Sequence, residues 1–101
     1  MKTESLTLKI TDSLDLLAGF QFLSTKEQKE AFVLVVDCLC GYPKPTKKEC
    51  PAPAPAHLLG AYLYVSNARN ACKLASLGYT DNITASYLIT ANLENALTLL
   101  S

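Results

Sequence analysis

All five prolines of this 101-residue chain fall within one short segment, residues 43–55. Proline has no amide hydrogen to donate and pushes the residue before it into extended geometry, so such a segment interrupts helices and sheets. It divides the chain into two proline-free halves. We interpret residues 43–55 as a semi-rigid connector, in preference to a polyproline ligand for an aromatic groove, and residues 1–101 as one small domain.

The second half carries the clearest helical pattern, over residues 57–77. Its apolar residues recur at intervals of three and four, as on one face of an amphipathic helix. They are Leu58, Ala61, Tyr62, Val65, Ala68, Cys72 and Ala75. Gly78 is typical of the position just beyond a helix, and Thr80 or Asp81 can cap a last helix that reaches about Leu100. The short link predicts that these two helices form an antiparallel hairpin.

Two further helices are predicted in the first half. Ser24 and the glutamate three residues later have the spacing of a capping box, in which each side chain bonds the other residue's backbone amide. A helix should therefore run over residues 25–39. An earlier helix, with Thr11 or Asp12 as its cap, should run to about Leu23.

Strands are the competing interpretation for parts of this half. Leu6, Leu8 and Ile10 alternate with polar residues, and the β-branched valines near position 35 also suit a strand. We predict an all-α fold of two helix hairpins joined by the connector, a four-helix bundle-like arrangement that dimerisation could complete. The alternative is an α+β fold with short strands near residues 5–11 and 31–39.

Charge is unevenly distributed, although nine basic and nine acidic residues leave no net charge. This balance excludes a globally basic nucleic-acid binder. Residues 51–101 contain only four charged residues, Arg69, Lys73, Asp81 and Glu94. An apolar segment with so little charge is either deeply buried or forms a surface for a partner. Because a domain of this size can bury few helices on all sides, we expect contact with a second copy or with another protein.

Tyrosines of the second half are the candidate contact residues. Tyrosine combines a large apolar ring with a polar tip, which suits a surface that is covered only on association. We predict that a partner binds at Tyr64, Tyr79, Ile83, Tyr87 and Leu97.

A cluster of thiols and the one histidine is the candidate metal site. Cys38, Cys40, Cys50 and His57 lie within twenty residues of one another and supply the ligand types that zinc prefers. Their spacing lacks the usual pair of cysteines separated by two residues. A zinc-stabilised module is therefore an alternative, and cysteines that bind no metal are the favoured interpretation. No other cofactor is indicated.

Lys44, Lys47 and Lys48 form the one basic cluster of the chain. Three lysines can contact phosphates and make binding sensitive to salt. A weak contact with nucleic acid through this loop is a further alternative, and a solvated loop is the favoured interpretation.

Catalytic motifs are absent from the sequence, which has neither a glycine-rich phosphate loop nor the common hydrolase and metalloprotease signatures. We therefore expect no enzymatic activity and no small-molecule substrate. The start of the chain lacks the apolar stretch of a secretory signal, and no apolar run approaches the ~20 residues that span a bilayer. We expect a cytoplasmic protein without membrane contact.

The predicted function is that of a small helical protein that self-associates or occupies the surface of another protein. Accessory and inhibitor proteins of viruses and mobile elements often share this profile, which is an analogy of class and not an inference from residues.

Overall fold

The computed structural model describes residues 3–42 and 56–100, and these residues contain helices and no strand. The elements are α1 (Thr3–Leu16), a short 3-10 helix η1 (Phe20–Phe22), α2 (Thr25–Cys40), α3 (Ala56–Ser76) and α4 (Asn82–Leu100). The predicted all-α fold with four main helices is confirmed. The connector at residues 43–55 lies outside the described residues.

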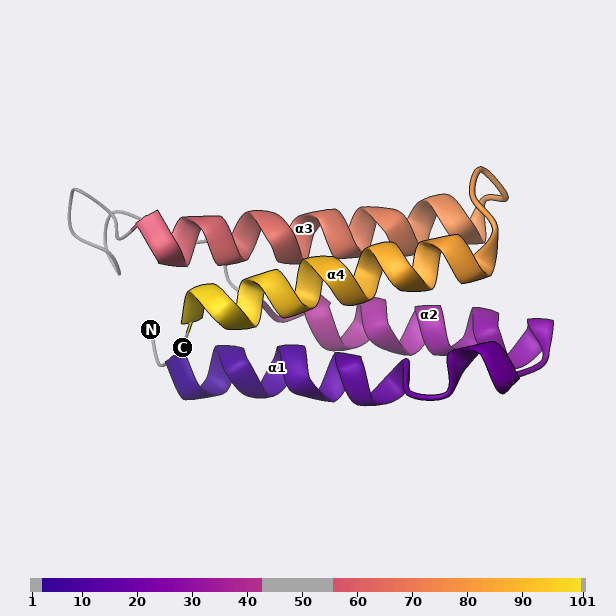
Figure 1. The fold of residues 1–101 in the computed structure, drawn as a ribbon, viewed down its shortest axis with the longest axis horizontal. Coiled ribbons are helices and arrows are strands. Elements are labelled where there is room, and N and C mark those ends of the chain that lie inside the picture. Colours follow the sequence, from indigo (N-terminus) through magenta and orange to yellow (C-terminus); the bar gives the residue numbers. More distant parts are fainter. Residues whose placement is uncertain (1–2, 43–55, 101) are drawn as a thin grey trace.

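The four helices form two layers of two. In Figure 1, α1 runs beside α2 and α3 runs beside α4, so each predicted hairpin is present. The hairpins pack on each other through α2 against α3 and α1 against α4. This is the arrangement of a four-helix bundle, with the shared core between the layers.

The first helix begins earlier than predicted. Residues 5–11 are helical, so a strand there is wrong, and so is a helix start at Thr11 or Asp12. The buried residues follow helical intervals of three and four. They are Leu6, Ile10, Ser13 and Leu17. Leu8, which the alternating pattern would bury, is 60% exposed.

Gly19 ends this helix before the predicted boundary at Leu23. Its φ of 68° is left-handed, a conformation that glycine adopts without steric cost. The chain then turns through η1, which buries Phe20 against Phe32 with ring centroids 5.0 Å apart. Gln28 donates a hydrogen bond from Nε2 to the Phe20 carbonyl at 3.3 Å. The corner between α1 and α2 is thus packed onto the bundle.

The capping box predicted at Ser24 is confirmed. Ser24 Oγ accepts from the Glu27 amide at 3.2 Å, and Glu27 Oε1 accepts from the Ser24 amide at 3.1 Å. These hydrogen bonds to the carboxylate lower the pKa of Glu27. The predicted helix over residues 25–39 is confirmed as α2, so the alternative of a strand near residues 31–39 is wrong.

Gly78 and Asp81 set the short link between α3 and α4. Gly78 has a φ of 85° and donates to the Ala75 carbonyl at 3.1 Å, while Tyr79 donates to the Leu74 carbonyl at 3.0 Å. This pair of bonds is a Schellman motif. Asp81 Oδ2 then accepts from the Thr84 amide at 3.2 Å, so Asp81 is the cap of α4.

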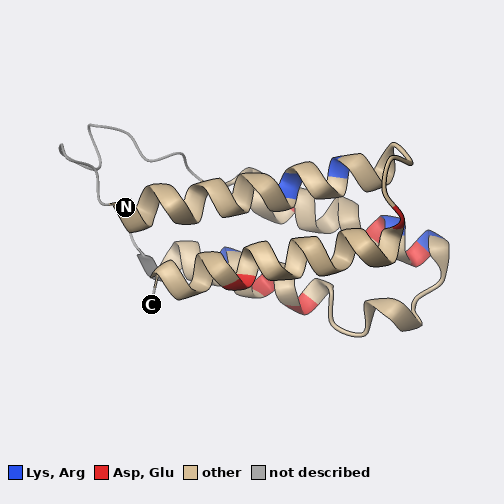
Figure 2. Cartoon of the chain, turned by 45° about the horizontal axis from the view of Figure 1, so that its top comes forward, with Lys and Arg blue, Asp and Glu red and all other residues tan. Residues whose placement is uncertain are grey.

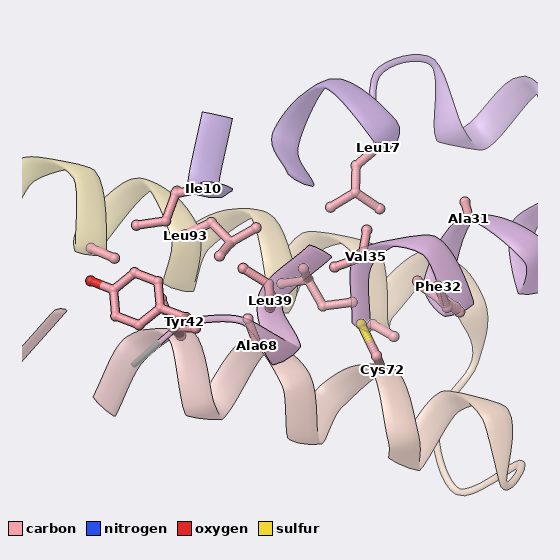
Figure 3. Close-up of a cluster of buried hydrophobic side chains, with 14 of the residues drawn as sticks. Ile10, Leu17, Ala31, Phe32, Val35, Leu39, Tyr42, Ala68, Cys72 and Leu93 are labelled. Carbon is pink, nitrogen blue, oxygen red and sulfur yellow. The ribbon is translucent and has the colours of Figure 1, made fainter. Parts of the chain in front are cut away.

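Side chains from all four helices meet in the core, part of which is drawn in Figure 3. Most of the large, fully buried side chains come from α1, α2 and α4. They include Ile10, Phe32, Val35, Leu39, Ile89 and Leu93. The α3 side of the core is lined by smaller residues, Ala61, Val65, Ala68, Cys72 and Ala75. Small side chains allow α3 to approach its neighbours closely, and a Cβ added at Gly60 would lie 2.9 Å from a Leu99 methyl carbon.

Candidate functional site

A row of leucines lies on the outside of α3. Leu59, Leu63, Leu74 and Leu77 are 42%, 54%, 46% and 70% exposed. Leu77 directly follows Ser76, the last residue of α3. Because the four leucines recur at helical intervals, they share one side of the helix, opposite its buried alanines. Two exposed asparagines continue the row between the second and third leucines. We call this row the outer face of α3: Leu59, Leu63, Asn67, Asn70, Leu74 and Leu77.

A second row lies on the exposed side of α4. It follows intervals of four and three along the helix. Its members are Thr84, Leu88, Ala91, Asn95 and Thr98. Since α3 and α4 pack side by side and both bury their other sides toward α1 and α2, the two rows point away from the α1–α2 layer. We call the two rows together the hairpin face.

The hairpin face contains no charged residue. The charges of α3 and α4 lie beside it, at Arg69, Lys73 and Glu94. Arg69 Nη2 donates to Ser66 Oγ at 3.4 Å. In Figure 2 most of α3 and α4 is tan, whereas blue and red segments are more frequent on the other two helices. An uncharged surface with exposed leucines is unusual on a monomer and typical of an interaction site.

The structure separates the five predicted contact residues into two groups. Tyr79 and Tyr87 are 78% and 68% exposed and are available to a partner. Tyr64, Ile83 and Leu97 are partly buried and pack against the core. The sequence interpretation did not include the exposed leucines. The sequence does contain a pattern that could have identified them, because the leucines recur at helical intervals on the side of α3 opposite the alanines.

The thiols and the histidine do not form a metal site among the described residues. Cys38 Sγ donates to the Lys9 carbonyl at 3.3 Å, and Cys40 and His57 are exposed. Cys50, which the zinc hypothesis requires, lies outside the described residues. Across residues 3–42 and 56–100, no three His, Cys, Asp or Glu side chains are grouped to hold a metal ion. The zinc module stays a prediction.

A small cleft lies between α2 and α3. It has a volume of about 200 Å³. Its lining residues are Phe32, Val33, Val36, Asp37, Cys72, Lys73 and Ser76. Burial raises the pKa of the Cys72 thiol to about 12, so the sulfur stays protonated at neutral pH and is a poor nucleophile. The Cys72 thiol is therefore not an activated nucleophile.

The lysines considered for nucleic-acid contact, Lys44, Lys47 and Lys48, lie outside the described residues, and that alternative also stays a prediction. Within the described part of the chain, no helix combines the length and the apolar character needed to cross a membrane. Comparisons with models of known protein families, with curated proteins and with solved structures give no match.

Proposed function

We propose that this protein is a non-catalytic interaction protein that self-associates through the hairpin face. The observation that carries the proposal is the row of exposed leucines on α3 within a surface free of charge. Contact between these leucine side chains and water is unfavourable. Packing against a matching apolar surface removes that contact. A second copy of the chain supplies such a surface without any other partner.

The size of the hairpin face suits a dimer. The 21 residues of α3 extend for about 30 Å at ~1.5 Å per residue. Two packed helices whose axes are ~10 Å apart present a surface about 20 Å wide. The face therefore covers on the order of 600 Å², close to the ~800 Å² that each partner contributes to a standard interface. Two such faces would bury about 1,200 Å² in total, the lower end of the range for stable, specific interfaces.

In this proposal the protein acts by covering a protein surface. That surface belongs either to its own copy or to another protein that competes with the copy. The free thiols of Cys38, Cys40 and Cys72 are typical of a reducing compartment. We therefore propose a cytoplasmic location. The resemblance to viral or mobile-element accessory proteins remains an analogy of size and composition.

Leu74→Lys is expected to convert the dimer into a monomer. Each copy would lose a leucine contact worth ~1.5–3 kcal/mol, and the two-fold interface would lose it twice, so Kd should rise at least about a hundredfold. The mass is measured by light scattering after size-exclusion chromatography, with circular dichroism to confirm an unchanged helix content.

Leu8→Lys is the matched control for this variant. Leu8 is 60% exposed, but it lies on α1, away from the hairpin face. The control should keep the mass of the unmodified protein. If Leu8→Lys dissociates the dimer and Leu74→Lys does not, the assignment to the hairpin face is wrong.

A further inference from the structure

The outer face of α3 is nearly the same when read in either direction. From the N-terminal end its order is Leu59, Leu63, Asn67, and from the C-terminal end it is Leu77, Leu74, Asn70. When two copies of one helix pack in antiparallel orientation, each residue faces a residue of the other copy, and the two residue numbers of every facing pair add up to the same total. Here the pairs are 59 with 77, 63 with 74 and 67 with 70, and their sums differ by no more than one. The row is therefore symmetric about a point between residues 68 and 69.

We propose that two copies of the chain pack α3 against α3 in antiparallel orientation, about a two-fold axis near residues 68 and 69. This inference rests on the proposed self-association and adds its geometry. In a two-fold interface, if one residue contacts a second residue of the other copy, the reverse contact is also made. Leu59 then faces the partner subunit's Leu77, and Leu63 faces the partner subunit's Leu74. Each apolar contact is made twice.

The two asparagines occupy the centre of this interface. Asn67 faces Asn70 of the partner subunit, and the symmetry repeats the pair on the other side of the axis. A side-chain amide has both donors and an acceptor, so two facing amides can satisfy each other when water is excluded. A polar pair within an apolar seam fixes the register, because a shift by one turn would place an amide against leucine.

Helix dipoles and charge favour the antiparallel orientation over the parallel one. With α3 antiparallel to its copy, opposite ends of the two helices lie side by side across the interface. Lys73 lies beside the outer face of α3. A parallel pair would place it against Lys73 of the partner subunit. In the antiparallel pair, Lys73 instead lies opposite position 64 of the other copy. It is then about 13 Å along the helix from the partner subunit's Lys73.

Disulfide formation between introduced cysteines tests this orientation. In the full chain with Cys38, Cys40 and Cys50 replaced by serine, three variants are prepared: Leu63→Cys, Leu74→Cys and the two changes together. Cys72 is retained because its side chain is 1% exposed. The double variant should form a covalent dimer as the main product of mild oxidation, since positions 63 and 74 face each other across the axis.

Each single variant is a control for the double variant. In the antiparallel dimer, the two copies of position 63 are about 16 Å apart along the helix, well beyond the ~7 Å between Cα atoms that a disulfide allows. The same separation prevents a bridge within one helix. Neither single variant should therefore form a covalent dimer, whereas an equal mixture of the two should give a dimer of one copy of each.

The outcomes separate this inference from the proposed function. Covalent dimers of both single variants would show a parallel pair and overturn the antiparallel geometry. A non-covalent dimer mass without disulfides in any variant would also overturn it, while self-association stands. A monomer mass for the unmodified protein would overturn both.

Discussion

Phe32→Ala is expected to lower the free energy of unfolding by about 3–5 kcal/mol. Phe32 is 2% exposed, and its ring packs on that of Phe20. It also lines the cleft between α2 and α3. The substitution therefore removes a ring contact that joins the corner at η1 to the core, and it leaves a cavity in place of the ring. Urea denaturation, followed by circular dichroism at one fixed protein concentration, measures the loss.

Phe22→Ala is the matched control, because the two phenylalanines differ in burial and not in type. Phe22 is 84% exposed at the end of η1. Its replacement should change the free energy of unfolding by no more than about 0.5 kcal/mol. Similar losses for the two variants would mean that Phe32 is not a core residue and that the packing of η1 on α2 is wrong.

Cys72 is expected to react with a thiol reagent at least about 1,000 times more slowly in the native protein than in the unfolded chain at pH 8. Its raised pKa of about 12 leaves about one thiolate in 10⁴, whereas an unfolded cysteine with a pKa of about 8.5 is ionised to roughly a quarter. Raising the pH should therefore increase the native rate about tenfold per pH unit until the thiol ionises. The measurement uses a chain whose other three cysteines are serine.

Cys40 provides the comparison for this experiment, because its side chain is exposed at the end of α2. A chain that retains only Cys40 should react at similar rates in the native and unfolded states. Equal native rates for Cys72 and Cys40 would contradict the burial of Cys72 between α2 and α3.

The boundaries of three main helices could be predicted because local chemistry sets them. The Ser24 capping box, the left-handed Gly78 and the Asp81 cap each act within a few residues of sequence. The start of α1 could not be predicted in this way. Leu6 and Ile10 fit both a strand interval and a helix interval, and only packing against the other helices decides between them.

The hairpin face was harder to predict than the fold. Helix α3 has two apolar sides, one of small residues such as Ala61 and Ala68 and one of leucines. Hydrophobicity alone favours the leucine side for the core, whereas the interval pattern over residues 57–77 predicted the side of Ala61, Val65 and Ala68, which is the buried one. The structure buries the alanine side, and small residues let α3 lie close to its neighbours; a Cβ added at Gly60 would lie 2.9 Å from a Leu99 methyl carbon. Which side remains outside is thus a property of packing between helices and not of α3 alone.

The mass of the unmodified protein in solution tests the central claim most directly. Sedimentation equilibrium of the full chain, over a wide range of concentrations and in the presence of a reductant, gives that mass without the influence of shape. We predict a mass of about twice the 10.9 kDa of one chain, falling toward 10.9 kDa only on dilution. A mass of 10.9 kDa at every concentration would contradict it and would leave the hairpin face without a second copy to cover it.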